Sequence, residues 1–158
     1  MAAIQNQAAR LPYAKATPLQ GGPASRLNLL PADLVIKVAY SAINPVDCGS
    51  ELSALGSLYS RQDVAGAIVE LGSNVSTLKI GQRVIRRYHG LLSGKAPNSG
   101  FHLYSSCLEN LFTTIPGSLP FSHAVVLPLS ISTAAIALYV QPQLPLPPPS
   151  PRAPGLLP

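Results

Sequence analysis

The chain has 158 residues, of which 47% are hydrophobic and only 11% are charged, and its formal net charge is +5. This composition excludes a disordered protein and suffices for one domain with a hydrophobic core. No nucleic-acid-binding motif accompanies the basic residues, so the positive charge indicates a solvated face rather than a nucleic-acid partner. Two cysteines exclude a disulfide framework. The N-terminus lacks the apolar segment of a signal peptide, so we expect a cytoplasmic, reducing location.

Short strands separated by turns dominate the chain up to residue 115. A strand-like start is expected over 1–10, and further strands over 15–19, 34–41, 64–71, 83–88, 101–106 and 111–115. A turn at Gly21-Gly22-Pro23 should close the second strand, and a helical turn is expected at 51–55. Short strands at this spacing predict a mainly β fold, a closed or partly open antiparallel barrel.

The strand over 34–41 is expected to lie at the centre of the sheet. Its Ile36, Val38 and Tyr40 should share one face, because side chains alternate along a strand. β-branched and aromatic residues also suit such a half-buried surface.

This strand ends at Asn44-Pro45, where Pro45 has no N–H and fixes its own φ. The resulting elbow presents the Asn44 amide, and Asp47 follows with a carboxylate. A site of this kind is commonly built on a stiff turn. The pattern also fits a plain turn in which these polar groups bond their own backbone.

Helices are expected from residue 116 onward. Ser122 is the predicted N-cap of a helix over 123–127, and Ser130 or Ser132 that of a second helix over 133–139. Residues 124–140 are apolar but at the lower limit of a membrane span and without flanking Lys or Arg, so no membrane helix is expected. Residues 1–140 should form the domain. Residues 141–158, with eight of the seventeen prolines, should be a disordered, extended tail.

Six motifs occur in a fixed order along the chain: A-I-N-P-V-D at 42–47, D-V-A-G at 63–66, V-E-L-G-S-N-V at 69–75, K-I-G-Q-R-V at 79–84, I-P-G-S-L-P-F-S at 115–122, and L-P-L-S-I-S-T-A-A at 127–135. Together they resemble the zinc-free branch of the medium-chain dehydrogenase/reductase superfamily, which contains quinone and enoyl reductases. G-L-L-S-G at 90–94 further resembles fungal trans-acting enoyl reductases of polyketide pathways. The resemblance implies a GroES-like, partly open antiparallel barrel with short C-terminal helices.

The same resemblance implies NADPH-dependent reduction of a double bond conjugated to a carbonyl, in a small-molecule enone, quinone or enoyl thioester. It assigns the nicotinamide-facing positions to Asn44, Pro45, Val46, Asp47, Cys48 and Thr133. Thr133 is the catalytic candidate, because its hydroxyl could donate to the carboxamide or to the substrate oxygen. The alternative is that Thr133 is simply a helix cap.

The resemblance predicts no metal site. Asn44 and Gln62 stand where zinc-dependent relatives have ligands, and Asp63 alone cannot make a three-ligand site. A Cys48–His pair formed by chance in space stays open as a nucleophilic alternative.

No G-x-G-x-x-G follows a predicted strand, so the relatives' Rossmann domain is not expected within these 158 residues. We therefore expect weak NADPH binding and no enzymatic hydride transfer by this chain alone. The alternative function is a non-catalytic truncated or interaction module, and whether the chain is an enzyme stays open. A half-cleft should also expose apolar surface, which favours self-association.

Overall fold

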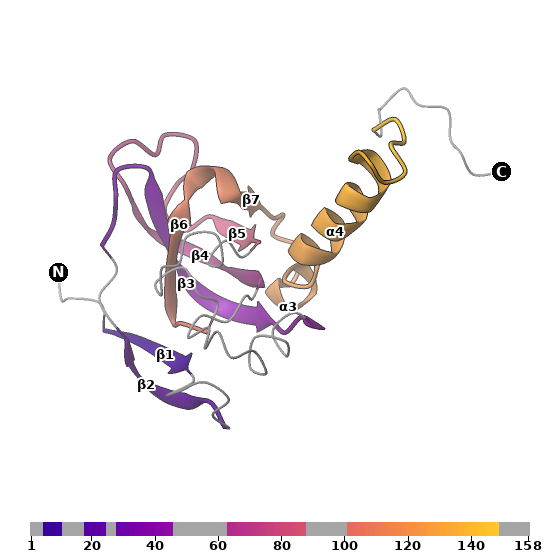
Figure 1. The fold of residues 1–158 in the computed structure, drawn as a ribbon. Coiled ribbons are helices and arrows are strands. Elements are labelled where there is room, and N and C mark those ends of the chain that lie inside the picture. Colours follow the sequence, from indigo (N-terminus) through magenta and orange to yellow (C-terminus); the bar gives the residue numbers. More distant parts are fainter. Residues whose placement is uncertain (1–4, 11–17, 25–27, 46–62, 88–100, 149–158) are drawn as a thin grey trace.

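A computed structural model describes residues 5–10, 18–24, 28–45, 63–87 and 101–148 (Figure 1). The helical turn predicted at 51–55 lies outside these residues, as does most of the strand predicted at 15–19. In the described part, the strands are β1 (Asn6–Arg10), β2 (Gln20–Ala24), β3 (Asp33–Ala42), β4 (Asp63–Leu71), β5 (Arg83–Arg86), β6 (Tyr104–Leu108) and β7 (Phe112–Thr114).

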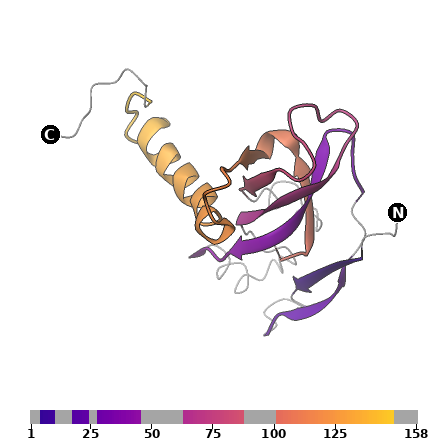
Figure 2. The same ribbon diagram turned by 180° about the vertical axis from the view of Figure 1, so that it is seen from behind.

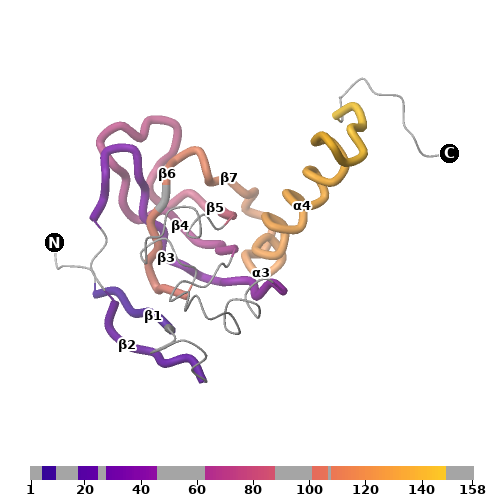
Figure 3. Tube along the Cα trace, in the orientation of Figure 1, coloured from indigo at the N-terminus to yellow at the C-terminus, as the bar shows by residue number. Residues whose placement is uncertain are grey.

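The strands form two antiparallel sheets that do not close on themselves. The larger sheet has the order β6-β3-β4-β5-β7, and the smaller one pairs β1 with β2. An isolated bridge between Ala8 and His102 links the smaller sheet to the segment that leads into β6. Figure 3 shows the β1–β2 pair below the larger sheet. The predicted mainly β, partly open antiparallel architecture is confirmed.

The hydrophobic core is formed by β-branched and leucine side chains of β3, β4 and β5. Its fully buried members are Leu34, Ile36, Val64, Ile68 and Val84. The predicted strands over 34–41 and 64–71 are confirmed as β3 and β4. The alternation along β3 is interrupted, since register shifts occur between Val35 and Ile36 and between Val38 and Tyr40. As a result Tyr40, expected on the Ile36 face, is 51% exposed.

The buried Asn6 side chain joins β1 to β6. Its Oδ1 accepts the Tyr104 N–H at 3.0 Å, and its Nδ2 donates to the Tyr104 carbonyl at 3.0 Å. The amide therefore pairs with Tyr104 as a neighbouring strand would. The same Nδ2 lies 3.3 Å from His102 Nδ1, which indicates that this ring nitrogen is the acceptor.

The turn predicted at Gly21-Gly22-Pro23 is wrong, because these residues lie inside β2. They pair with Ala9, Ala8 and Gln7 of β1. Proline and glycine are tolerated there because β2 is an edge strand, on which one row of N–H groups needs no partner.

The chain then turns helical, through the 3-10 turn η2 (Glu109–Leu111) before β7 and the helices α3 (Phe121–Ala124) and α4 (Leu127–Tyr139) after it. α4 projects away from the barrel on the side opposite β1 and β2 (Figures 1 and 2). None of its residues is buried. By length and composition alone, Phe121–Tyr139 could cross a membrane.

Residues 141–148 are not free of the domain, contrary to the extended tail expected from their prolines. The N–H groups of Leu144 and Leu146 donate to the carbonyls of Ala137 and Leu138, at 3.2 and 2.8 Å. This part of the tail therefore folds back onto the last turn of α4 and satisfies carbonyls that a helix end leaves open.

Candidate functional site

The predicted elbow lies at the end of β3, a central strand of the larger sheet. Ala42 closes β3 and is buried, Ile43 is 73% exposed, and the half-buried Asn44 and exposed Pro45 follow. The buried end of this strand fixes the position of Asn44, whose side-chain Nδ2 is itself buried. Val46, Asp47 and Cys48, the other predicted cofactor-facing residues, lie outside the described residues.

The helical segment packs against this end of the sheet. A small cluster of Ala42, Ala65 and Val125, with Ile85 and Phe121 partly buried around it, joins β3, β4 and α3. Ala42 is two residues from Asn44. The cluster therefore brings the elbow and the base of α4 to the same edge of the domain.

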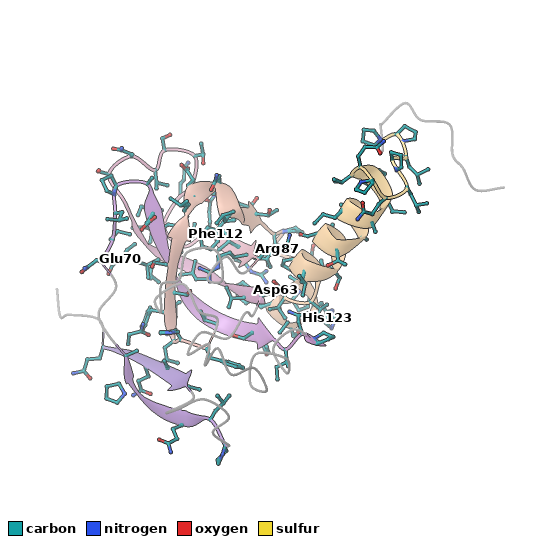
Figure 4. All side chains as sticks on the ribbon, in the orientation of Figure 1. Asp63, Glu70, Arg87, Phe112 and His123 are labelled. Carbon is teal, nitrogen blue, oxygen red and sulfur yellow. The ribbon has the colours of Figure 1, made fainter. Side chains whose placement is uncertain are left out.

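The first turn of α4 is held by a carboxylate from the sheet. Asp63, 1% exposed at the start of β4, accepts the Leu129 N–H through Oδ2 at 2.7 Å. A helix leaves its first N–H groups without internal partners, and a negative charge at that end is favourable. Pro128, which has no N–H, occupies the preceding position. Figure 4 shows Asp63 beside the base of α4.

These contacts correct the predicted helix caps. α4 begins at Leu127 instead of 133, so Thr133 lies exposed in its second turn and is not a cap. Ser130 and Ser132 donate back to carbonyls four residues earlier. α3 begins after Pro120, without the side-chain cap expected from Ser122.

Arg83 holds the segment that leads from β7 to α3. From β5, its Nη1 donates to the Gly117 carbonyl at 2.6 Å and its Nη2 to the Leu119 carbonyl at 2.6 Å. The guanidinium also stacks over the Phe121 ring, 4.2 Å from the ring centre. A planar fork of donors suits such a set of carbonyls, and its stacking on an aromatic ring adds a cation–π contact.

The described residues offer no metal centre. Among them, no three His, Cys, Asp or Glu side chains lie together. One oxygen of Asp63 accepts the helix N–H described above. Cys48, the cysteine of the open Cys–His alternative, lies outside the described part, while His123 is exposed on α3 and His102 contacts Asn6.

The family model of the alcohol dehydrogenase GroES-like domain matches residues 30–133, a span that includes both Asn44 and Thr133. The chain belongs to this family. The resemblance inferred from the six motifs is thereby confirmed at the level of the GroES-like domain.

Relatives of this GroES-like domain include reductases. The chain is 47% identical over 159 residues to the trans-enoyl reductase himH of Aspergillus japonicus, covering 98% of this chain and 46% of that protein. It is 33% identical to the zinc-binding alcohol dehydrogenase domain-containing protein cipB of Emericella nidulans, covering 86% and 45% of the two chains. The crystal structure of CurK enoyl reductase has the same fold, with a TM-score of 0.73 at 23% identity over 86% and 43%. The chain thus spans about half the length of the relatives it matches.

The GroES-like domain depends on residues that the sequence did not single out. Asp63 was considered only as a metal ligand, whereas its carboxylate bonds the helix. Arg83, within K-I-G-Q-R-V, indicated the family but not its hydrogen bonds to Gly117 and Leu119, and Asn6 lies outside the six motifs. A proline at a helix start is the one local signal that was missed, at Pro128.

Proposed function

We propose that this GroES-like domain is the catalytic part of an NADPH-dependent oxidoreductase that reduces a carbon–carbon double bond conjugated to a carbonyl. The observation that carries the proposal is the 47% identity to a trans-enoyl reductase over 98% of this chain. The elbow and α4 contribute the chemistry that such a reaction needs from the protein. Because the relatives are about twice as long, the activity proposed is that of the whole enzyme.

The residues present fit the nicotinamide end of the cofactor. The Asn44 amide has both a donor and an acceptor on a turn that Pro45 stiffens. Val46, Asp47 and Cys48 continue the same segment in the sequence. Thr133 is exposed on a helix whose base packs near the elbow, so its hydroxyl is accessible to a ligand.

When bound, NADPH supplies the hydride, and the protein's task is placement. Asn44 would orient the carboxamide, and Pro45 would keep water from that face of the ring. The Thr133 hydroxyl would donate a hydrogen bond to the carboxamide or to the substrate carbonyl oxygen, where negative charge develops during reduction. The acceptor class is an enone, a quinone or an enoyl thioester.

The test uses a protein in which a relative's nucleotide-binding domain follows Pro148, so that the contacts of Leu144 and Leu146 with α4 are kept. Loss of NADPH absorbance is followed with a panel of enones, quinones and enoyl thioesters. We expect Thr133→Val to lower kcat by about 100- to 1,000-fold, as for loss of one donor to a developing charge, and Thr133→Ser to retain most of the wild-type kcat. Lys79→Ala, on the exposed surface, is the matched control. Reduction of no acceptor, or equal rates in Thr133→Val and the control, would refute the proposal.

A further inference from the structure

Two charged side chains from neighbouring strands reach the segment that carries Thr133. Asp63, at the start of β4, accepts the Leu129 N–H at the base of α4. Arg83, on β5, donates to carbonyls of residues 116–119 and stacks on Phe121. Figure 4 places Asp63 at the end of β4 nearest the helix and Glu70 at the far end of the same strand.

Beyond its base, α4 has no fully buried side chain to fix its direction within the described part of the chain. The buried side chains of the helical segment are Ala124 and Val125, both before α4 begins. No residue of α4 itself is buried. The direction of the helix therefore depends on the small cluster around Val125 and on the polar ties at its base.

We infer that Asp63 is a positioning residue: its buried carboxylate sets the direction of α4 and thereby the place of Thr133. The inference rests on the proposed function for the role of Thr133, but the position of the helix is measurable without it. Asp63 acts on Thr133 through the hydrogen bond that it accepts from the Leu129 N–H. Arg83 also helps to fix the position of the helices, because it binds the segment between β7 and α3.

The geometry gives the size of the effect. Thr133 lies four residues beyond Leu129, or about 6 Å along the axis, so a 10° tilt at the base moves it by about 1 Å. A misplacement of that size can cost about 100-fold in rate. Ile136, seven residues beyond Leu129, is about 10 Å from the pivot and moves by about 4 Å for a 20° tilt.

Distances between two spin labels on the 158-residue chain test the position directly. The labels are attached at Ile136→Cys and Ile80→Cys, which are 46% and 67% exposed, with both native cysteines replaced by serine. We expect Asp63→Ala to shift or broaden the distance distribution by several ångströms. Asp63→Asn keeps an oxygen that can accept the N–H, and it should retain the wild-type distribution. Glu70→Ala, which removes a carboxylate from the same strand, is the matched control and should change nothing.

In the grafted enzyme, Asp63→Ala should lower kcat by about 10- to 100-fold. KM for NADPH should change far less, and Asp63→Asn should restore kcat. If Asp63→Ala does not fold, Asp63→Ser takes its place, since its hydroxyl is too short to reach Leu129. A wild-type distance distribution in the Ala or Ser variant, or the same change in Glu70→Ala, would overturn the inference. Failure of the proposed function would look different: no turnover in any variant, with the distance shift still present.

Discussion

Replacing Gly66 by alanine should destabilise the domain where its two central strands meet. Gly66 on β4 pairs with Val38 on β3. A Cβ at Gly66 would lie 2.2 Å from the Lys37 carbonyl oxygen and 3.0 Å from its carbon. Because close carbon–oxygen contacts are about 3.3 Å, the two strands would have to separate by about 1 Å.

The loss of stability should be near the upper end of the range known for overpacked cores. Such changes typically cost about 1–3 kcal/mol. Here the clashing atoms are backbone, and β3 is held by β4 on one side and by β6 on the other. We therefore expect a loss of about 3 kcal/mol in the free energy of unfolding. For a chain of 158 residues, that corresponds to a fall in Tm of about 6–12 °C.

Urea unfolding followed by circular dichroism measures this difference. Gly21→Ala is the matched control, because Gly21 also lies in a strand but an added Cβ there meets no atom within 4 Å. The control should stay within about 0.5 kcal/mol of wild type or gain slightly, since alanine restricts the unfolded chain. Equal unfolding midpoints for the two variants would refute the argument from close approach.

Four further outcomes are expected. Asn6→Ala should lower the free energy of unfolding by about 1–3 kcal/mol, measured in urea, because the part-buried N–H and carbonyl of Tyr104 lose their partner. Arg83→Lys should lower the free energy of unfolding by about 1 kcal/mol, since one amine cannot make both hydrogen bonds of the guanidinium. The control Arg87→Lys, at an exposed position, should be neutral. Ending the chain after Gln141 should leave Tm within a few degrees, because residues 142–148 are all exposed, yet reduce the helical dichroism relative to a chain ending at Pro148. Elemental mass spectrometry of the purified protein should find well under one zinc per chain, and one tightly held zinc would overturn the zinc-free assignment.

The central sheet could be predicted because its signals are local. β3 and β4 are runs of β-branched and aliphatic residues between turn residues. β3 extends one residue beyond its predicted bounds at both ends, and β4 extends one residue at its start only. β2 was missed because Gly21-Gly22-Pro23 has the composition of a turn. Pairing with β1 overrode that preference at an edge of the sheet, where proline loses no ladder bond.

The hydrogen bonds that hold the site could not be predicted, because they join residues far apart in sequence. Asp63 and Leu129 are 66 residues apart, Asn6 and Tyr104 are 98 apart, and neither pair leaves a local pattern. Asp63 within D-V-A-G indicated the family but not the contact. The start of α4 was misplaced for a related reason: a partner from the sheet satisfies its first turn, so no capping side chain is present.

The hydrogen bond of Asp63 and the contacts of α3 also help to decide whether the apolar stretch Phe121–Tyr139 crosses a membrane or packs against protein. Its composition would allow a membrane span, but α4 alone has 13 residues, about 20 Å of helix against a hydrocarbon core of about 30 Å. A span would need α3 as well, and α3 is docked on the sheet through Ala124 and Val125. Withdrawing it would also break the hydrogen bond from the Leu129 N–H to the buried carboxylate of Asp63, and a lost charge-assisted hydrogen bond is costly in a buried site. α4 is therefore better explained as a helix that packs against protein than as a membrane span.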